Sequence, residues 1–476
     1  MKPLGSAIPV VVDLDLTLIL TNSLHEMAAA AIFRKPAALM RSLIKLPSGR
    51  HHVKAALASE IAAEGLVFPY REDLLDWLRE KAAEGHAIHL CSAAHQSIAD
   101  EVARRLGIFA SAVGSDIVNL KGAEKSAYLQ RKFPDGFIYV GDSSSDIHVW
   151  EKSSGIVLAG APGSVASKAR RLGKPVLKEF KNTRLDLGTF VKALRVHHWS
   201  KNLLIFVPLV LSHQWATPGL IGTFLLAFLC LVGVTSGTYL LNDMADLSAD
   251  RQHWSKKNRA LASGRLQIGV GLTLACALLL ASMIGALMLD YAFALALAAY
   301  LAITGAYSGG LKRVPLLDLL IIGVLFTVRI VMGTVLVEES HPVWLLVFSV
   351  FFFFSLAVAK RHTEIVRAAK AGANSLKARG YMVEDAPLTL ALGTASAVVS
   401  LVVMLLFIIE NMASGSLYTR PELLSGIPLV LSVWIGRIWL LAHRGVMADD
   451  PVTFALRDKT SLGLGVAIAA LFAVAL

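Results

Sequence analysis

The fold is decided by residues 220–250, which read LIGTFLLAFLCLVGVTSGTYLLNDMADLSAD. The first part has no charged residue and is long enough to cross a bilayer as a helix, which takes about 20 residues. Asp243, Asp246 and Asp250 then follow at offsets of three and four, which place them on one helix face. Because gathered carboxylates repel one another, the pattern indicates a cation site, and Mg²⁺ on a diphosphate is the natural occupant. A solvated acidic loop is the alternative, and the apolar run leading into the motif disfavours it.

The composition of the whole chain is that of a membrane protein. Of 476 residues, 55% are hydrophobic and only 17% are charged, and the mean hydropathy of +0.60 is too high for an ordinary soluble enzyme. From residue 202 onward we expect an all-α polytopic membrane domain of about nine transmembrane helices. The candidate spans are 203–213, 219–242, 268–288, 291–306, 315–337, 343–359, 387–409, 425–442 and 460–476.

The charge distribution predicts the topology. The net charge of +11 would suggest nucleic acid in a soluble chain, but here the Lys and Arg residues collect in alternate loops between the apolar runs, so no nucleic acid is expected. By the positive-inside rule the basic loops are cytoplasmic. We therefore expect a multi-pass protein of a bacterial inner (cytoplasmic) membrane, with the N-terminal domain in the cytoplasm and the C-terminus outside. Asp13 and Asp15 interrupt the first apolar run, so no signal peptide is expected.

The first 185 residues have the pattern of a soluble domain. Short β-rich runs alternate with charged helical stretches, which predicts an α/β domain of Rossmann type. Residues 24–80 are expected to form a small helical cap, 186–201 a basic juxtamembrane linker, and 202–476 the membrane domain. The basic amphipathic face in the cap either rests on anionic headgroups or packs on its own domain.

Polar residues follow several strands of this domain. Asp13 and Asp15 end a buried strand, Ser92 follows a second, Asp142 and Asp146 follow a third, and Lys125 lies between the last two groups. The carboxyl ends of parallel strands are where such sheets bind ligands. This ordered set resembles the haloacid dehalogenase (HAD) superfamily of phosphohydrolases, nearest its small-capped phosphoserine phosphatase-like members.

The resemblance implies a role for each of these residues. Asp13 would be the nucleophile and Asp15 the general acid and base. A Mg²⁺ ion would be held by Asp13, Asp15 and Asp142, supported by Asp146. Ser92 and Lys125 would neutralise the transferring phosphoryl oxygens. The glycine usual after the second aspartate is Leu16 here.

The acidic motif and the apolar spans together resemble the UbiA superfamily of intramembrane prenyltransferases. Such enzymes commonly have a second aspartate-rich motif after the fourth span. The corresponding residues 307–318 contain one carboxylate, Asp318, and two cations, Lys312 and Arg313. One carboxylate cluster serves one diphosphate, whereas added cations suit further phosphates.

Residues 195–202, 307–312 and 359–364 resemble those of decaprenyl-phosphate phosphoribosyltransferases. That resemblance implies transfer of 5-phosphoribose from phosphoribosyl diphosphate (PRPP) to a polyprenyl phosphate. Asp243 and Asp246 would be catalytic and, with Asp250, would hold a second Mg²⁺, so that each domain has one. The expected substrate-binding residues are Lys201, Asn202, Asn242, Lys256, Arg259, Tyr307, Lys312, Asp318, Arg329, Lys360 and Arg361.

The fusion of the two domains suggests consecutive reactions. The transferase product carries a ribose 5-phosphate, which the HAD-like domain would remove to give polyprenyl-phosphoryl-ribose, a pentose donor precursor for cell-envelope glycans. The alternative is an aromatic prenyltransferase with an accessory or inert HAD domain. Lipid length and oligomeric state are not encoded in these patterns.

Overall fold

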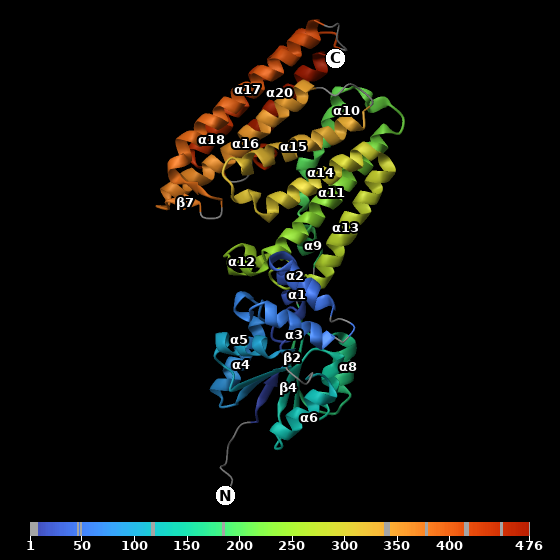
Figure 1. The fold of residues 1–476 in the computed structure, drawn as a ribbon, viewed down its shortest axis with the longest axis vertical. Coiled ribbons are helices and arrows are strands. Elements are labelled where there is room, and N and C mark those ends of the chain that lie inside the picture. The colour runs from blue at the N-terminus through green and yellow to red at the C-terminus, as the bar shows by residue number, and fades with distance from the viewer. Residues whose placement is uncertain are drawn as a thin grey trace. The chain divides into compact units, whose positions relative to one another are not determined.

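The computed structural model describes residues 8–44, 47, 50–115, 120–182, 186–337, 343–376, 379–413, 418–447 and 451–475 (Figure 1). The chain divides into two compact units. The N-terminal unit comprises Met1–Leu194 and Tyr239–Ala275, and the C-terminal unit comprises Arg195–Thr238 and Cys276–Leu476. The acidic motif therefore packs in the same unit as the α/β fold, although almost 50 residues separate the two in sequence.

The N-terminal unit is built on one parallel sheet of six strands. Its strand order is β3-β2-β1-β4-β5-β6, and β1 pairs with β2 on one side and with β4 on the other. The strands are β1 Val10–Val12, β2 Ile88–His95, β3 Ser111–Ser115, β4 Ile138–Gly141, β5 Gly155–Ala159 and β6 Val176–Phe180. The α/β prediction is confirmed.

Helices cover both faces of the sheet. Side chains alternate between the two faces along each strand, so an apolar strand needs cover on both sides. Val10 and Val12 join one apolar core and Val11 joins the other. Figure 1 shows α4 and α5 on one side of the sheet and α6 and α8 on the other. The helices are α4 Glu72–Ala83, α5 Gln96–Leu106, α6 Ala123–Lys132, α7 Ile147–Trp150, α8 Gly163–Arg170 and α9 Leu187–Ala193, with the 3₁₀ segment η3 Ser144–Asp146.

The residues predicted as the cap, 24–80, form helices, as expected, and the last of these helices, α4, continues to Ala83. Residues Leu74, Leu75 and Leu78 of α4 are buried in the core beside the sheet, so α4 belongs to the α/β layer. The remaining cap elements are α1 Ser23–Arg34, α2 Pro36–Ile44, α3 Arg50–Glu60 and η2 Ala63–Gly65. Exposed apolar side chains, among them Met40 and Ile44, lie on α2, so both expectations for the cap face stay open.

Seven helices among the described residues are long and apolar enough to cross a membrane, which identifies a multi-pass membrane protein. These spans are Leu220–Ala245 (α11), Ile268–Leu289 (α13), Tyr291–Gly309 (α14), Leu317–Val335 (α15), Val343–Lys370 (α16), Val383–Glu410 and Pro421–Arg444. The span Val383–Glu410 comprises the 3₁₀ turn η8 Val383–Asp385 and most of the helix α17 Ala386–Ala413. The span Pro421–Arg444 comprises the 3₁₀ turn η9 Pro421–Ser425 and the helix α18 Gly426–Arg444.

The predicted count of nine spans is not confirmed. The first predicted span, 203–213, is divided between a 3₁₀ segment, η4 Val196–Phe206, and a short helix, α10 Val207–Leu211. The last, 460–476, is α20 Lys459–Ala475, of 17 residues. Apolar composition alone does not fix helix length, and Pro208 at the start of α10 interrupts regular hydrogen bonding. The remaining elements are η5 Gln214–Ala216, α12 Leu247–Gln252, η6 Lys256–Asn258, η7 Leu311–Arg313, β7 Ser375–Leu376, β8 Tyr381–Met382 and α19 Pro451–Ala455.

Candidate functional site

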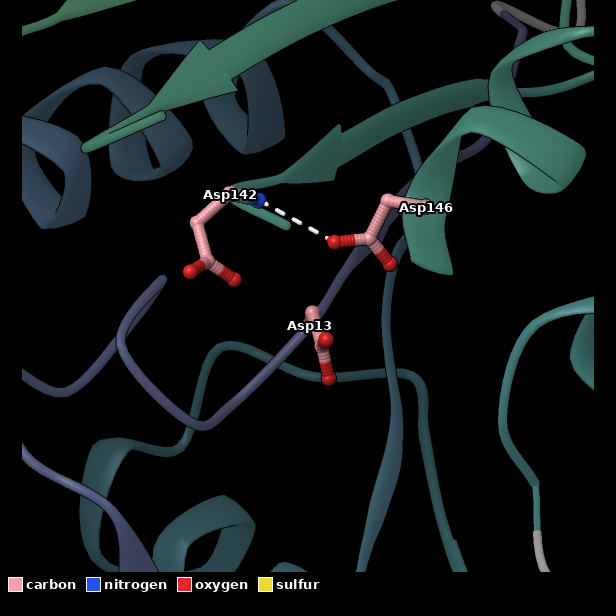
Figure 2. A group of neighbouring side chains, drawn as sticks. All are labelled: Asp13, Asp142 and Asp146. Atoms are coloured by element: carbon pink, nitrogen blue, oxygen red, sulfur yellow. Dashed lines mark hydrogen bonds between the residues drawn. The ribbon is translucent and has the colours of Figure 1, made fainter. Parts of the chain in front are cut away.

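Three carboxylates meet at the carboxyl edge of the sheet. Asp13 follows β1, and Asp142 and Asp146 follow β4, the strand beside β1. Figure 2 shows the three side chains converging, and one oxygen from each lies within 4.8 Å of the others. A Cβ at Gly141 would come within 2.8 Å of the Asp146 carboxylate, so the glycine permits this close approach. The structure thus brings together three of the four predicted metal ligands of this domain.

Asp146 is fixed by hydrogen bonds from its own loop. Its Oδ2 accepts from the backbone N–H of Asp142 at 3.1 Å and from the N–H and hydroxyl of Ser143, both at 2.9 Å. The hydroxyl of Tyr139 donates to Oδ1 at 2.9 Å. The side chain is therefore held in place as part of the loop, which fits its predicted supporting role.

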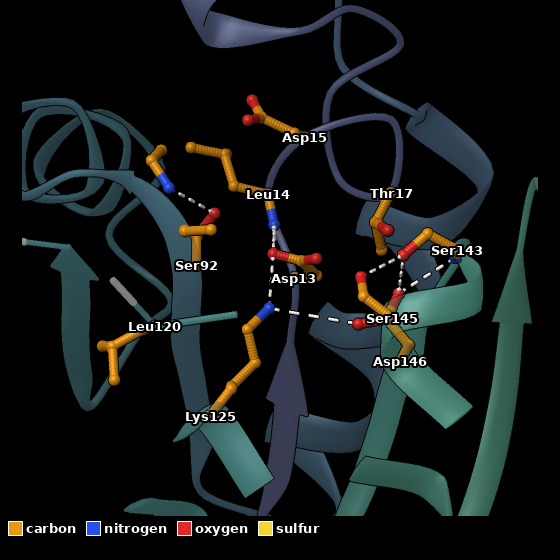
Figure 3. Close-up of polar contacts among 12 residues, drawn as sticks. Asp13, Leu14, Asp15, Thr17, Ser92, Leu120, Lys125, Ser143, Ser145 and Asp146 are labelled. Carbon is orange, nitrogen blue, oxygen red and sulfur yellow. Dashed lines mark hydrogen bonds and ion pairs between the residues drawn. The ribbon is translucent and has the colours of Figure 1, made fainter. Parts of the chain in front are cut away.

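Lys125 reaches the carboxylates from α6. Its Nζ lies 3.1 Å from Asp13 Oδ1 and 4.0 Å from Asp146 Oδ1 (Figure 3). The same ammonium donates to the Tyr139 hydroxyl at 3.0 Å. Ser92 lies within β2, the strand on the other side of β1 from β4, and its hydroxyl accepts from the Ala94 N–H at 3.1 Å. A cation and a hydroxyl are thus positioned near the predicted nucleophile.

The carboxylates raise one another's proton affinity. Burial raises the pKa of Asp13 to about 6, and the nearby Lys125 charge opposes that rise. Burial also raises the pKa of Asp142 to about 8, with further contributions from the charges of Asp146 and Asp13. Buried like charges need a counter-charge beyond one lysine, and an oxygen-only donor set suits Mg²⁺. These residues therefore fit the predicted ion.

Asp15 lies apart from the three carboxylates. Its oxygens accept from the Ser23 N–H at 2.7 Å and from the Ser23 hydroxyl at 3.1 Å, at the first turn of α1. Figure 3 shows its side chain on the far side of Leu14 from the cluster. The following residue, Leu16, has a φ of 61°, the left-handed conformation that glycine adopts without cost. Leu16, which replaces the glycine usual in the family, therefore has a strained backbone conformation.

Arg71 holds this strained loop, and sequence reasoning missed it. Its buried guanidinium donates to the Thr17 carbonyl at 3.0 Å, to the Leu16 carbonyl at 3.2 Å and to Asn182 Oδ1 at 2.7 Å. Thr17, also missed, donates to Asp142 Oδ1 at 3.0 Å. An isolated arginine more than 50 residues from the motif gives no pattern that sequence reasoning could use.

In the acidic motif, the prediction of one helix face is wrong. α11 ends at Ala245, α12 begins at Leu247, and Asp246 lies between them. The chain turn nevertheless brings two carboxylates together, because Arg259 Nη1 lies 3.1 Å from Asp243 Oδ1 and 2.6 Å from Asp250 Oδ2. Burial raises the pKa of Asp250. Carboxylate oxygens are ligands that Mg²⁺ prefers, and among the described residues both of these carboxylates are paired with Arg259.

The other residues predicted for this site lie close to the motif. Lys256 Nζ is 3.9 Å from Asp250 Oδ1 and comes from η6, the turn that also leads to Arg259. Asn242 is half-buried on the last turn of α11, next to Asp243. The predicted carboxylates and cations of this motif are therefore assembled from consecutive short elements.

A second polar cluster lies in the C-terminal unit around Asp318. This carboxylate is fully buried, and it accepts from Arg361 Nη2 and from the Tyr381 hydroxyl, each at 2.7 Å. Arg361 also forms an ion pair with Glu364. Asp318 and Arg361, both predicted to bind substrate, thus pair with each other. The Nε–H of Arg361 is a donor without a partner among the described residues.

A third cluster joins Asn202, Arg329 and Tyr300. Arg329 Nε donates to Asn202 Oδ1 at 3.0 Å, and Nη2 donates to the Tyr300 hydroxyl at 2.7 Å. The guanidinium also stacks over the rings of Tyr300 and Phe326, and Lys201 lies over Phe326 as well. This cluster brings together three of the predicted residues, with two aromatic side chains that the sequence did not single out.

The remaining predicted residues are Tyr307, Lys312 and Lys360. The Tyr307 hydroxyl accepts from Arg379 Nη1 at 2.6 Å. Lys312 is half-buried on η7, and Lys360 is exposed on α16. Lys312 thus lies in a short turn, whereas Tyr307 and Lys360 lie within helices, α14 and α16.

Fold and sites together define a multi-pass membrane enzyme of prenyltransferase type that carries a HAD-like hydrolase domain. The model of the UbiA prenyltransferase family matches residues 203–457, and the chain belongs to that family. The model of haloacid dehalogenase-like hydrolases matches residues 10–151. Both resemblances inferred from the motifs are confirmed.

Three relatives show how far the similarity extends. An uncharacterized protein, y4nM, of Sinorhizobium fredii is 45% identical over 98% of this chain and 91% of its own length. Nodulation protein NoeC of Azorhizobium caulinodans is 32% identical over 61% of this chain and 94% of its own length. Decaprenyl-phosphate phosphoribosyltransferase of Mycolicibacterium smegmatis is 31% identical over 39% of this chain, and the match spans 60% of that relative.

Proposed function

We propose that this protein transfers 5-phosphoribose from PRPP to a polyprenyl phosphate, and that its HAD-like domain then removes the ribose 5-phosphate. The observation that carries the proposal is that one chain brings carboxylates and cations together in two places. One is the carboxylate pair facing Arg259 beside Lys256. The other is the cluster of Asp13, Asp142 and Asp146 beside Lys125. The name of the mycolicibacterial relative supports the substrate class.

For the transfer step, Asp243, Asp246 and Asp250 with Asn242 would hold Mg²⁺, which would offset the negative charge of the diphosphate. Lys256 and Arg259 stabilise the pyrophosphate as its bond to ribose C1 breaks and it leaves with the electron pair. An oxygen of the lipid phosphate forms the new bond to C1. That oxygen is already anionic, so no general base is needed.

The positive residues of the C-terminal unit would bind the remaining phosphates. Arg361 Nε is a buried donor without a partner among the described residues, and a buried unpaired donor is costly unless a ligand uses it. Lys201, Lys312, Lys360 and Tyr307 lie in the same unit, and Asp318 orients Arg361. In contrast, Asn202 and Arg329 satisfy each other, which supports a role in shaping the site.

For the phosphatase step, Asp13 attacks phosphorus and the bond to the ribose 5-oxygen breaks. Asp15 gives that oxygen a proton and then takes one from the water that hydrolyses the aspartyl-phosphate, which releases inorganic phosphate. Lys125 and Ser92 balance the charge on the phosphoryl oxygens. Asp13, Asp142 and Asp146 would hold a Mg²⁺ ion, which would lower the repulsion between the nucleophile and the phosphate.

The location of the protein follows from the same reasoning. Basic loops on one side of the spans support a cytoplasmic location for the N-terminal domain, where PRPP is available, and a protein of the cytoplasmic membrane. The proposed product, polyprenyl-phosphoryl-ribose, would serve as a pentose donor precursor for envelope glycans.

The test is a mass analysis of lipid products. Purified protein is incubated with PRPP, polyprenyl phosphate and Mg²⁺, as wild type and as Asp13→Asn, which keeps the side-chain size but removes the nucleophile. Wild type should form the ribosylated lipid, whereas Asp13→Asn should accumulate the same lipid heavier by one phosphate. The proposal for the HAD-like domain fails if both proteins give the same phosphorylated lipid at the same rate. Product from an aromatic acid and a prenyl diphosphate, with none from PRPP, would instead indicate an aromatic prenyltransferase.

A further inference from the structure

The short helix α12 carries two neighbouring residues with different partners. Asp250 faces Arg259 within the acidic motif, and Arg251 reaches the cap of the HAD-like domain. Arg251 and Glu26 of α1 form a bidentate ion pair, with Nη1 to Oε2 at 3.0 Å and Nη2 to Oε1 at 2.7 Å. Both side chains are less than 5% exposed. Because a buried pair must be hydrogen-bonded throughout to be tolerated, this contact is a specific one.

The rest of the Arg251 guanidinium is also bound. Its Nε donates to the Ala262 carbonyl at 2.9 Å, and Nη1 also donates to the Val67 carbonyl. Arg251 therefore connects Ala262, which follows the acidic motif, with Val67, which follows the last cap element η2. All of these residues belong to the N-terminal unit.

Backbone contacts surround this ion pair. Gln267 donates to the Leu20 carbonyl at 3.0 Å, and Ser248 donates to the Gly65 carbonyl at 3.3 Å. Gly264 has a φ of 74°, and a Cβ there would lie 2.7 Å from Leu20 Cβ. The two segments thus pack too closely for a side chain at this point, as expected of a built interface.

The same helix α1 reaches the phosphatase site. Ser23, its first residue, fixes both oxygens of Asp15, and Glu26 lies three positions further along. One helix of the HAD-like domain therefore contacts the predicted general acid at its start and the acidic-motif segment in its next turn.

We propose that α1 is a docking element for the acidic-motif segment, and that Arg251 is a positioning residue that keeps Asp250 and Asp243 in place through this contact. The HAD-like domain is then a structural part of the transferase site as well as a second enzyme. The docking stands on the geometry alone, whereas its effect on transfer rests on the proposed function.

The docking is tested by cutting the chain between the two segments. A protease site is placed between Asn182 and Asp186 in the full-length protein, which carries a C-terminal affinity tag and is purified in detergent. After cleavage, residues 1–182 of the wild type should stay with the tagged part. Glu26→Arg should release them, with retention reduced by about tenfold or more. Glu72→Arg, on an exposed residue of α4, is the matched control and should retain them.

Folding of the released fragment is checked separately. A fragment that elutes as a monomer with a native-like circular dichroism spectrum shows that Glu26→Arg broke the contact and left the domain intact. Glu26→Gln, which keeps the shape of the side chain, provides a milder variant and should weaken retention in the same direction. Release of the wild-type fragment, or full retention with Glu26→Arg, would overturn the docking proposal.

The positioning role is tested on the uncleaved chain by pyrophosphate release. Arg251→Lys keeps the charge but loses the bidentate geometry, so the KM for PRPP should rise by about tenfold while kcat changes much less. A purely structural residue would instead lower the active fraction at an unchanged KM, and that result would overturn the positioning role. If the wild type releases no pyrophosphate while the cleaved fragment stays bound, the proposed function fails and the docking stands.

Discussion

Replacing Asp142 by Asn should stabilise the HAD-like domain when no Mg²⁺ is present. The pKa of Asp142 rises from 3.8 to about 8, mainly through burial and then through the charges of Asp146 and Asp13. A raised carboxyl pKa means that the folded state binds the proton more tightly than the unfolded state. The contribution to stability is therefore fully present below pH 3.8 and is lost as the pH rises toward 8.

The size of the effect follows from the same pKa values. Between the unfolded pKa and neutral pH lie about three units, and each unit is worth about 1.4 kcal/mol, so the destabilisation at pH 7 is on the order of 4 kcal/mol. Asn carries no charge at any of these pH values and avoids this loss. Its side-chain oxygen can still accept the hydrogen bond from Thr17, which spans 3.0 Å in the wild type, so the substitution removes little else.

Hydrogen exchange measured by mass spectrometry on the full-length protein in detergent provides the assay. In the presence of a chelator at pH 8, the β4 peptide should exchange more slowly in Asp142→Asn than in wild type, and the difference should vanish near pH 4. Added Mg²⁺ should protect wild type far more than the variant. Glu124→Gln, an exposed change on α6, serves as the control. Equal exchange of wild type and Asp142→Asn at pH 8 without Mg²⁺ would refute the repulsion argument.

Three further outcomes follow from the structure. Leu16→Gly should be neutral or stabilise by up to about 1 kcal/mol in thermal unfolding, because φ is already positive there. Leu18→Gly, in the buried core, is the control and should cost several times as much. A loss of stability at Leu16 as large as that at Leu18 would contradict the claim that the Leu16 backbone is strained. Asp243→Ala should abolish pyrophosphate release but leave hydrolysis of a small phosphomonoester intact, and loss of both in a folded variant would count against two separate sites. Arg361→Met should lower stability by about 3–5 kcal/mol, because the buried Asp318 loses its cationic partner and keeps only the hydrogen bond from Tyr381. The double variant Arg361→Met with Asp318→Asn should recover part of that loss in the same unfolding assay.

The carboxylate cluster of the HAD-like domain could be predicted from sequence because parallel strands bring their carboxyl ends to one edge of the sheet. Asp13 and Asp142 are far apart in the chain, yet each follows a strand, and β1 and β4 are neighbours in the sheet. The side chain of Arg71 could not be found in this way. It holds the loop through backbone carbonyls of Leu16 and Thr17, and a contact to a carbonyl leaves no residue pattern at the accepting position.

For the acidic motif, the residues could be predicted from sequence but their local structure could not. Its residues were recognised, but the helix that the spacing predicts is interrupted at Asp246. Spacing describes which residues would align if the helix continued, and it contains no information on where the helix ends. The structure also supplies a reason for Arg259 that spacing did not give, since its guanidinium is the group on which Asp243 and Asp250 converge.

In the membrane domain, sequence identified charges but not their partners. Arg361 pairs with Asp318, and Arg329 pairs with Asn202. A charged side chain buried among membrane helices is costly without a polar partner, so each such residue predicts a partner nearby. Which residues pair depends on helix packing, and apolar composition alone does not determine packing.

The division of the chain into domains also depends on packing more than on sequence order. The linker at 186–201 separates a soluble pattern from an apolar one, but Tyr239–Ala275, which lies beyond it, packs with the HAD-like fold. That segment carries the acidic motif and contains Arg251, whose buried partner is Glu26 of the cap. A fusion that served only to raise local concentration would need no such contact. The buried ion pair therefore supports the inference that the HAD-like domain helps to hold the acidic motif in place.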